Sequence, residues 1–307
     1  MDNQTELNKL VSVHLGKAGD GSVVKPYITP DFVDASLLVA VPRHLNRTGY
    51  GLEDHNLPFV GFDAWNAYEF STLLTNGFPV SGWVKFSYDS NTPNIVESKS
   101  VKLYLNSYNM ARLIKTQDEL WLIEEKIAED LSQATGGRVD VTISIGDVDT
   151  VRPMKGDYMA LETYCNVEKM SFDQYNESAD ILEVVPSIGR YERWRSHSLR
   201  SNCRVTNQPD WGDVYIHIKG EKAVTPESLL KYIISMRKEN HFHEEICECI
   251  YKRLHDLLNP EELLVTCLYT RRGGIDINPT RASGYDVMWR NTNITDAFHL
   301  CTKTSRQ

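Results

Sequence analysis

The chain has 307 residues, 41% of them hydrophobic and 24% charged, a mixture typical of a globular protein rather than a disordered or fibrous one. This length allows two domains, each with its own core. The 33 basic and 42 acidic residues give a net charge of −9, which disfavours nonspecific binding to nucleic acid or an anionic membrane and favours a small-molecule partner.

The N-terminal sequence MDNQTELNKL lacks the basic start and apolar run of a secretory signal. No hydrophobic stretch of the chain approaches the length of a membrane span. The six cysteines are scattered along the chain rather than dense as in a disulfide scaffold, which is typical of a reducing compartment. We therefore expect a cytoplasmic location, where a thiol can stay reduced.

Several elements are predicted in the first half of the chain. Residues 95–105 alternate in the manner of a strand, with charged and aliphatic side chains on the same face. Thr116 and Glu119 have capping-box spacing ahead of a helical repeat that ends at Gly136. Alternating apolar residues over 139–145 then predict a half-buried strand.

The second half shows a similar order. We predict a strand over 213–219, a helix over 228–238 preceded by the N-cap Thr225 and a proline, a helix over 243–258, and a strand over 263–270. The second half thus loosely repeats the order of the first, which predicts a duplicated antiparallel unit whose helices cover one face of a sheet. Between the halves, the polar residues 166–199 are predicted to be an insertion or linker.

The stretch SNCRVTNQPDWG places Cys203 seven residues before Asp210, with a turn-forming Asn-Gln-Pro sequence between them. The thiolate is the reactive form of cysteine and needs a nearby proton acceptor or cation near neutral pH. Asp210 could serve Cys203 in this way. Alternatively, Cys203 is an inert core residue and Asp210 only closes the turn through its own backbone.

Two further stretches allow more than one interpretation. In NHFHEEICEC, His243 and Cys247 would share a helix face and could bind zinc, although the same residues could equally cap and pack a helix. In YTRRGGIDINP, Arg271 and Arg272 beside two glycines could grip a phosphate, or Gly273 could simply supply the positive φ of a hairpin turn. No dinucleotide-binding GxGxxG sequence and no P-loop occurs.

Together these segments resemble the QueF family of NADPH-dependent 7-cyano-7-deazaguanine reductases. The segments that carry the resemblance occur in the family's order: VPRHLNR (41–47), LPFVGFDAWNAYEFS (57–71), ESKSVKLYLNSYN (97–109), SNCRVTNQPDWG (201–212), FHE (242–244) and TRRGGIDINP (270–279). The resemblance runs from about residue 35 to residue 280. It implies an α+β fold of tandem tunnelling-fold (T-fold) units, each with an antiparallel sheet covered by a pair of helices, and commonly a homodimer. The corresponding domains would be 1–165, which carries the signature motif, a linker over 166–199, and 200–307, which carries the catalytic cysteine.

The resemblance also implies a reaction. Cys203 would attack the nitrile carbon to form a covalent thioimide, Asp210 would shuttle the proton, and His243 would supply a proton at the imine stage. Reduction of a nitrile to a primary amine takes two hydrides and hence two NADPH molecules. The family works without a metal, so we expect none.

The implied binding residues fall into two groups. Glu97 and Glu244 would accept the N–H donors of the guanine-like edge, with Ser98 and Phe242 completing the substrate site. The candidates for NADPH are residues of the signature motif and of the arginine-glycine segment: Ser98, Lys99, Lys102, Arg271, Arg272, Gly273 and Gly274.

Three other functions are compatible with parts of this pattern. A QueF-like amidinotransferase would keep the thioimide but add ammonia, although the intact ESKSVKLY motif argues for hydride transfer. A zinc cyclohydrolase on the same fold would need a metal. A deazaguanine carrier would bind the base without turnover.

Overall fold

The computed structural model describes residues 30, 32–145, 158–188, 191–204, 207–291 and 295. The contacts of the chain define two compact units, which are described separately. Of the described residues, unit 1 takes those within Met1–Asp54, Ala64–Asp149 and Arg272–Ile275, and unit 2 takes those within His55–Asp63, Thr150–Arg271 and Asp276–Gln307.

Unit 1 contains a long hairpin, two longer helices and a strand that returns to the hairpin, together with several shorter elements. Its strands are β1 (Ala40–Pro42), β2 (Val60–Leu74, whose first residues belong to unit 2), β3 (Pro79–Asp89), β4 (Asn94–Val96), β5 (Arg112–Ile114) and β6 (Val139–Ile145). Its helices are α2 (His44–Arg47), α3 (Ser98–Asn106) and α4 (Leu120–Thr135), with short 3₁₀ turns η1 (Ala35–Leu37), η2 (Thr48–Tyr50) and η3 (Gln117–Glu119).

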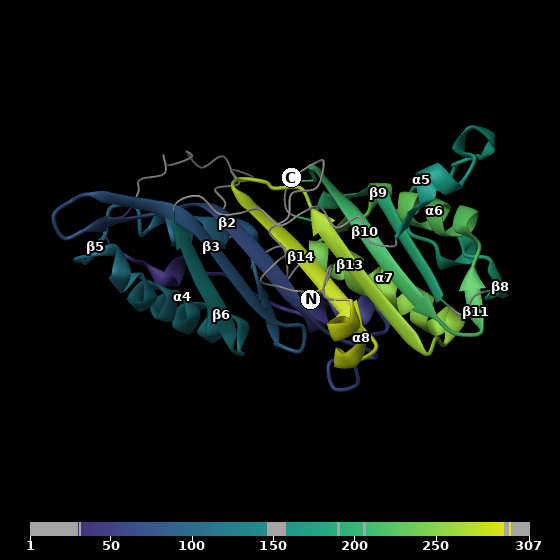
Figure 1. Cartoon of the computed structure of the whole chain (residues 1–307), viewed down its shortest axis with the longest axis horizontal. Coiled ribbons are helices and arrows are strands. Elements are labelled where there is room, and N and C mark those ends of the chain that lie inside the picture. The colour runs from purple at the N-terminus through teal and green to yellow at the C-terminus, as the bar shows by residue number, and fades with distance from the viewer. Residues whose placement is uncertain are drawn as a thin grey trace, which may run out of the picture. The chain divides into compact units, whose positions relative to one another are not determined.

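The sheet of unit 1 is built on antiparallel pairs. Strand β3 lies between β2 and β6 and pairs antiparallel with β6, so that Tyr88 is opposite Val139. Helix α4 packs on β6 (Figure 1). In the core, the rings of Trp65 and Phe86 stack with their centroids 5.2 Å apart.

The strand predicted over 95–105 is wrong, because only its beginning belongs to β4 and the remainder forms α3. Glu97 ends the extended chain and caps the helix, since its Oε2 accepts the Ser100 N–H at 2.7 Å. Buried residues at helical spacing, such as Val101 and Tyr104, then face the core. The same residues therefore fit both a strand-like alternation and a helical spacing, and the helical spacing is the one that forms.

The other elements predicted for this unit are confirmed. Helix α4 follows η3 and ends at Gly136, whose φ of 76° is the left-handed conformation that glycine adopts most readily. The predicted capping box does not form as expected, because Thr116 makes no side-chain cap bond. Instead Glu119 accepts the N–H of Lys115 at 2.7 Å. Strand β6 has the predicted bounds.

Unit 2 contains a second hairpin, a second pair of longer helices and two further long strands, together with several shorter elements. Its strands are β7 (Met159–Ala160), β8 (Val184–Pro186), β9 (Tyr191–Cys203), β10 (Pro209–Lys219), β11 (Lys222–Val224), β12 (Asn240–His241), β13 (Glu262–Tyr269) and β14 (Ile275–Ala282). Its helices are α5 (Leu161–Tyr164), α6 (Pro226–Ser235), α7 (His243–Leu258) and α8 (Tyr285–Arg290), with η4 (Val167–Lys169), η5 (Ala179–Ile181) and η6 (Met236–Lys238).

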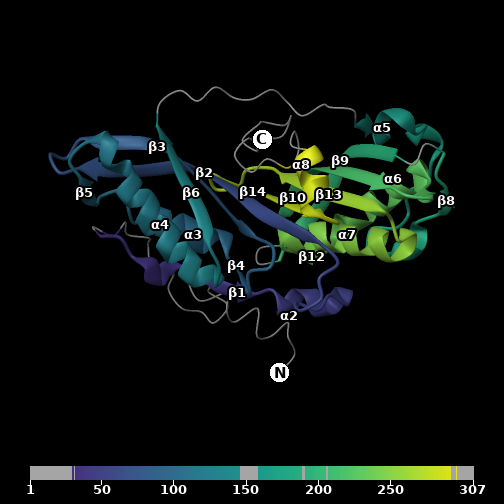
Figure 2. The same ribbon diagram turned by 60° about the horizontal axis from the view of Figure 1, so that its bottom comes forward.

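The strands of unit 2 run in the order β12, β9, β10, β13, β14. The long pairs are antiparallel, as predicted, whereas the short strands β7 and β12 pair parallel with β9. Helices α6 and α7 lie on one face of this sheet (Figure 2) and pack on β9 and β13, respectively. Within the described residues, no helix is long and apolar enough to cross a membrane.

The helices predicted in this half are confirmed. Thr225 accepts the N–H of Ser228 at the start of α6, and α7 ends at Asn259, whose φ is 44°. The predicted linker is wrong for residues 191–199, which form most of β9. Polar side chains hid this strand, because its interstrand bonds are made by the backbone rather than by apolar residues.

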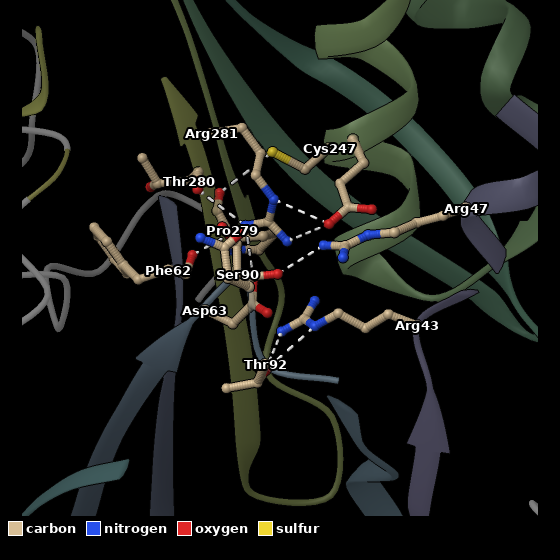
Figure 3. A network of polar contacts seen from close by, with 12 residues as sticks. Arg43, Arg47, Phe62, Asp63, Ser90, Thr92, Cys247, Pro279, Thr280 and Arg281 are labelled. Carbon is tan, nitrogen blue, oxygen red and sulfur yellow. Dashed lines mark hydrogen bonds and ion pairs between the residues drawn. The ribbon is translucent and has the colours of Figure 1, made fainter. Parts of the chain in front are cut away.

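A buried ion-pair cluster holds α7 against β14. The guanidinium of Arg281 lies 2.8 Å from Asp63 and 2.8 Å from Glu248 on α7, with Cys247 beside them (Figure 3). Burial alone would lower the pKa of Arg281, but the two carboxylates outweigh it and raise the pKa. Removal of one partner would leave an uncompensated buried charge, so this cluster fixes the helix that begins at His243.

Candidate active site

Cys203 lies at the end of β9, where the chain turns into β10. Its N–H donates to the carbonyl of Gln208 at 2.7 Å, and the N–H of Asn207 donates to its carbonyl at 2.8 Å. Asn207 has a φ of 55°, which asparagine tolerates better than most residues. The predicted turn between Cys203 and Asp210 is thus confirmed; Val205 and Thr206 lie outside the described residues.

Cys203 differs from the other described cysteines in its exposure. It is partly exposed, whereas the other four are buried: Cys165, Cys247, Cys249 and Cys267. Burial raises the pKa of the Cys249 and Cys267 thiols, which keeps them protonated and unreactive. Among the cysteines that the structure describes, Cys203 is therefore the candidate nucleophile.

Asp210 lies on the strand next to Cys203. It is opposite Ser201 in the β9–β10 register and is almost fully buried. Ser201 and Cys203 are two residues apart on one strand, so their side chains point to the same face, and Asp210 shares that face as a diagonal neighbour of Cys203. This arrangement is the one expected if Asp210 serves the Cys203 thiol rather than only closing the turn.

His243 reaches the same region from the other flank of β9. Strand β12 pairs parallel with β9 so that His241 is opposite Cys203, and α7 begins two residues later. The Nε2 of His243 lies 3.5 Å from Oδ2 of Asp210. The structure therefore gathers Cys203, Asp210 and His243 around the end of one strand.

The first turn of α7 also carries the two predicted substrate residues of this unit. Phe242 is the N-cap residue, and the Glu244 side chain is buried in the first turn. The partial positive charge of the helix N-terminus favours carboxylates at this position.

The zinc interpretation of this stretch is not supported by the described residues. The Sγ of Cys247 lies 3.5 Å from the carbonyl of Val265, and that of Cys249 lies 3.8 Å from the hydroxyl of Tyr232. Both cysteines thus point into the core while His243 faces Asp210. Within the described part of the chain, no three His, Cys, Asp or Glu residues are grouped so that they could hold a metal ion.

An ion-pair network that the sequence did not predict adjoins Cys203. Glu245 accepts the Phe242 N–H at 2.6 Å and lies 2.7 Å from the guanidinium of Arg204, the residue after Cys203. His241 lies between two carboxylates, 3.5 Å from Glu245 and 3.2 Å from Glu239. A glutamate at the third position of a helix was the one available signal, but Phe242 at the N-cap obscured the capping pattern.

This network determines the charge of its histidine. Burial alone would lower the pKa of His241, but the hydrogen bonds to Glu239 and Glu245 outweigh burial and raise the pKa to about 9. The same bond to His241 lowers the pKa of Glu239 to about 2. His241 is therefore a cation at neutral pH, held opposite Cys203 in the sheet.

In unit 1, the signature motif begins at the N-terminus of α3. Glu97 is 2% exposed, and Lys99 Nζ lies 3.9 Å from its Oε1. Ser98 is the first helical residue. Lys102, one turn further, donates to the carbonyl of Gly273 at 2.8 Å and to Glu69 at 2.7 Å.

The arginine-glycine segment forms the hairpin turn that one interpretation predicted. Gly273 and Gly274 have φ values of 57° and 81°, and a Cβ at Gly274 would lie 2.5 Å from the Glu69 carboxyl carbon. Arg271 and Arg272 are partly buried rather than fully solvated. The bond from Lys102 to Gly273 brings together two of the segments predicted to bind NADPH, and their cations suit a phosphate-bearing ligand.

Comparisons with known proteins agree with this arrangement. A family model described as "Nitrile reductase, 7-cyano-7-deazaguanine-reductase N-term" matches residues 30–143, and one described as "QueF-like protein" matches residues 209–286. The first match covers the signature helix of unit 1, and the second covers Asp210, His243 and the glycine turn.

Curated relatives match nearly the whole chain. Proteins named "NADPH-dependent 7-cyano-7-deazaguanine reductase" are 40% identical in Colwellia psychrerythraea, covering 92% of this chain and 94% of the relative, and 38% identical in Dechloromonas aromatica, covering 88% and 91%. A relative of the same name in Cupriavidus necator is 40% identical over 86% of this chain and 93% of its own length. The chain belongs to the family of NADPH-dependent 7-cyano-7-deazaguanine reductases.

Among solved structures, an archaeosine synthase QueF-Like in the apo form is 20% identical and covers 33% of this chain and 94% of its own. Its TM-score of 0.27 is too low to support an argument about this chain.

Proposed function

We propose that this chain reduces the nitrile of 7-cyano-7-deazaguanine to the primary amine, with two molecules of NADPH as the hydride donors. The observation that carries the proposal is the partly exposed Cys203 at the end of β9, with Asp210 on the adjacent strand and His243 beyond the other flank. The names of the curated relatives support both the substrate and the hydride donor.

The first step is covalent addition. The sulfur of Cys203 bonds to the electrophilic nitrile carbon, the triple bond becomes a C=N double bond, and the nitrogen takes up the proton that the thiol lost. Asp210 moves that proton, because it shares the face of Cys203 and is buried away from bulk water. The product is a thioimide attached to the enzyme.

Reduction follows in two stages. A hydride from the first NADPH adds to the thioimide carbon, the C–S bond breaks to release the thiolate, and an imine remains. A hydride from the second NADPH converts the imine to the amine, and His243 supplies a proton at this stage. One nitrile, two NADPH and two protons thus give one amine and two NADP⁺.

Recognition of the base uses buried carboxylates. Glu97 and Glu244 accept the parallel N–H donors of the guanine-like edge, with Ser98 and Phe242 adjacent to them in sequence. Lys99 and Lys102 of the signature helix, together with the segment from Arg271 to Gly274, bind the phosphates of NADPH.

We further propose that each unit is a T-fold, that the chain forms a homodimer, and that it acts in the cytoplasm. The same succession of hairpin, helix, helix and strand in both units supports a duplicated fold.

The direct test is a turnover assay combined with intact mass spectrometry. We expect 7-cyano-7-deazaguanine to stimulate NADPH oxidation with two cofactors consumed for each amine, and the nitrile alone to add its own mass to the protein. Ammonia-dependent amidine formation without NADPH oxidation would show the amidinotransferase instead. Binding without either reaction would show a carrier, and turnover that requires zinc would show a metal enzyme.

A further inference from the structure

The imidazole of His243 lies flat against the ring of Tyr269, the last residue of β13. The two ring centroids are 3.8 Å apart and the planes differ by 5°. Tyr269 is completely buried, and burial raises the pKa of its hydroxyl well above the usual value, so the ring is a fixed neutral surface. One face of His243 is therefore occupied by an immobile aromatic ring.

A histidine that moves protons needs a group to orient it, and commonly that group is a carboxylate or carbonyl bonded to the second ring nitrogen. In His243, Nε2 is the nitrogen near Asp210, at 3.5 Å. Its Nδ1 is buried, and within the described part of the chain it has no hydrogen-bond partner. The stacked ring of Tyr269 is thus the contact that defines the plane of the imidazole.

The position of Tyr269 depends in turn on Gly212. The two residues are opposite each other in the β10–β13 register. A Cβ at Gly212 would lie 3.1 Å and 3.3 Å from Tyr269 ring carbons and 3.1 Å from the carbonyl of Leu268, closer than ordinary van der Waals contact. The glycine therefore leaves the space into which the ring settles.

We propose that Tyr269 is a positioning residue for His243: its ring, admitted by Gly212, holds the imidazole so that Nε2 faces Asp210. This inference rests on the proposed function for its catalytic consequence, but not for its geometry. In this proposal Tyr269 acts through His243.

The geometry has a spectroscopic signature that does not depend on the substrate. Protons above the face of an aromatic ring are shielded, so the carbon-bound ring protons of His243 should resonate upfield of those of an exposed histidine such as His197. Tyr269→Phe keeps the ring and should keep this shift. Tyr269→Leu removes the ring and should abolish it, and Gly212→Ala should reduce it by displacing the ring.

The kinetic prediction separates the stages of the reaction. We expect Tyr269→Leu to lower kcat for amine formation at least tenfold while KM for the nitrile changes less than threefold, because base recognition is assigned to other residues. The thioimide should still form, since addition is assigned to Cys203 and Asp210. Tyr269→Phe should restore kcat to within about threefold of the unmodified chain.

The chain offers a matched control on the same helix. Tyr251 is also buried and lies beside His255, with centroids 5.9 Å apart and planes differing by 19°. Tyr251→Leu should lower thermal stability without changing kcat below its melting temperature. If Tyr269→Leu does not fold, Gly212→Ala and Tyr269→Phe still test the proposal. Gly212→Ala moves the ring and should lower kcat, whereas Tyr269→Phe leaves the ring in place and should preserve kcat.

Two results would overturn the proposal: normal turnover in a folded Tyr269→Leu or Gly212→Ala variant that has lost the upfield shift, or no upfield shift in the unmodified chain. Failure of the proposed function is a separate outcome. In that case the unmodified chain would not oxidise NADPH in response to the nitrile, while the signals of His243 would still show whether Tyr269 orients the ring.

Discussion

The end of β2 in unit 1 and the end of β9 in unit 2 form the same two kinds of backbone hydrogen bond but carry different side chains. In unit 1, Leu74 donates to the carbonyl of Phe78 at 2.9 Å and accepts from Gly77 at 2.8 Å. In unit 2, Cys203 makes the corresponding bonds with Gln208 and Asn207 at 2.7 Å and 2.8 Å. A short parallel strand follows each, β5 beside β2 and β12 beside β9.

The side chains at these equivalent places decide what each can do. Leu74 lies opposite Ile114, whereas Cys203 lies opposite His241. The helix that follows begins in unit 1 with the buried Leu120 and the exposed Trp121, but in unit 2 with His243 and Glu244. In the proposed function, the catalytic side chains would therefore lie at the strand end of unit 2 alone, because function depends on side chains placed on a fold rather than on the fold itself.

The first helix of more than one turn in each unit, α3 in unit 1 and α6 in unit 2, differs in the opposite sense. Helix α6 of unit 2 is capped by the hydroxyl of Thr225, an ordinary N-cap. Helix α3 of unit 1 is capped by the buried carboxylate of Glu97, with two lysines in its first turns. Unit 1 therefore has a buried carboxylate at the start of the helix where unit 2 has a neutral hydroxyl.

The largest difference should appear when the residue at each of the two strand ends is replaced by alanine. Cys203→Ala should abolish the mass adduct and lower turnover by at least about a thousandfold, because no other described thiol is accessible. Leu74→Ala, at the equivalent place, should cost about 1 kcal/mol of unfolding free energy and leave turnover unchanged. Survival of the adduct in Cys203→Ala would assign the nucleophile to another thiol.

A second comparison separates binding from capping. Glu97→Gln keeps an oxygen that can accept the Ser100 N–H but loses the charge, so KM for the nitrile should rise by roughly a hundredfold with little change in melting temperature. Thr225→Ala should cost about 1 kcal/mol of stability and leave KM unchanged. Equal KM values in the two variants would mean that Glu97 only caps the helix and does not bind the base.

The smallest effect concerns pH. Because the pKa of His241 is raised to about 9, its ion pairs stabilise the fold fully below about pH 6.5, and this stabilisation is lost as the pH rises through 9. The pKa of Glu239 is lowered to about 2, so its contribution is lost only as the pH falls through that value.

His241→Gln should therefore lower the unfolding free energy on the order of 2 kcal/mol near pH 6 and by almost nothing near pH 10. Urea unfolding across this range measures the difference. Ile114→Val, at the equivalent place in unit 1, should show a small loss that does not vary with pH. A pH-independent loss in His241→Gln would mean that its imidazole is not charged in the folded protein.

Local pattern predicted a large part of the fold. The helices α4, α6 and α7 and the strands β6 and β13 were predicted because apolar periodicity and terminal signals such as Thr225 act within a few residues. The strand predicted over 95–105 failed because charged residues at alternate positions also fit a helix whose buried face is carried by residues such as Val101. Strand β9 was missed in part because its backbone pairs with partners distant in sequence.

The candidate site was predicted as a set of residues but not as an arrangement. Cys203, Asp210 and His243 lie in motifs that the resemblance identifies, and only pairing of β9 with β10 and β12 gathers them. Gly212 and Tyr269 lie in the stretches SNCRVTNQPDWG and YTRRGGIDINP, but no local pattern indicated the ring contact, because it forms across the sheet.

The sequence by itself determined which chemical groups this protein has and indicated the helices α4, α6 and α7, because reactivity and helix formation depend on residue type and near neighbours. Tertiary structure alone decided that one thiol of the five described is accessible, that His241 is charged between two glutamates, and that a tyrosine on β13 lies against the imidazole of α7. Burial, pKa and ring orientation are set by atoms far apart in the chain, so no local pattern could have specified them.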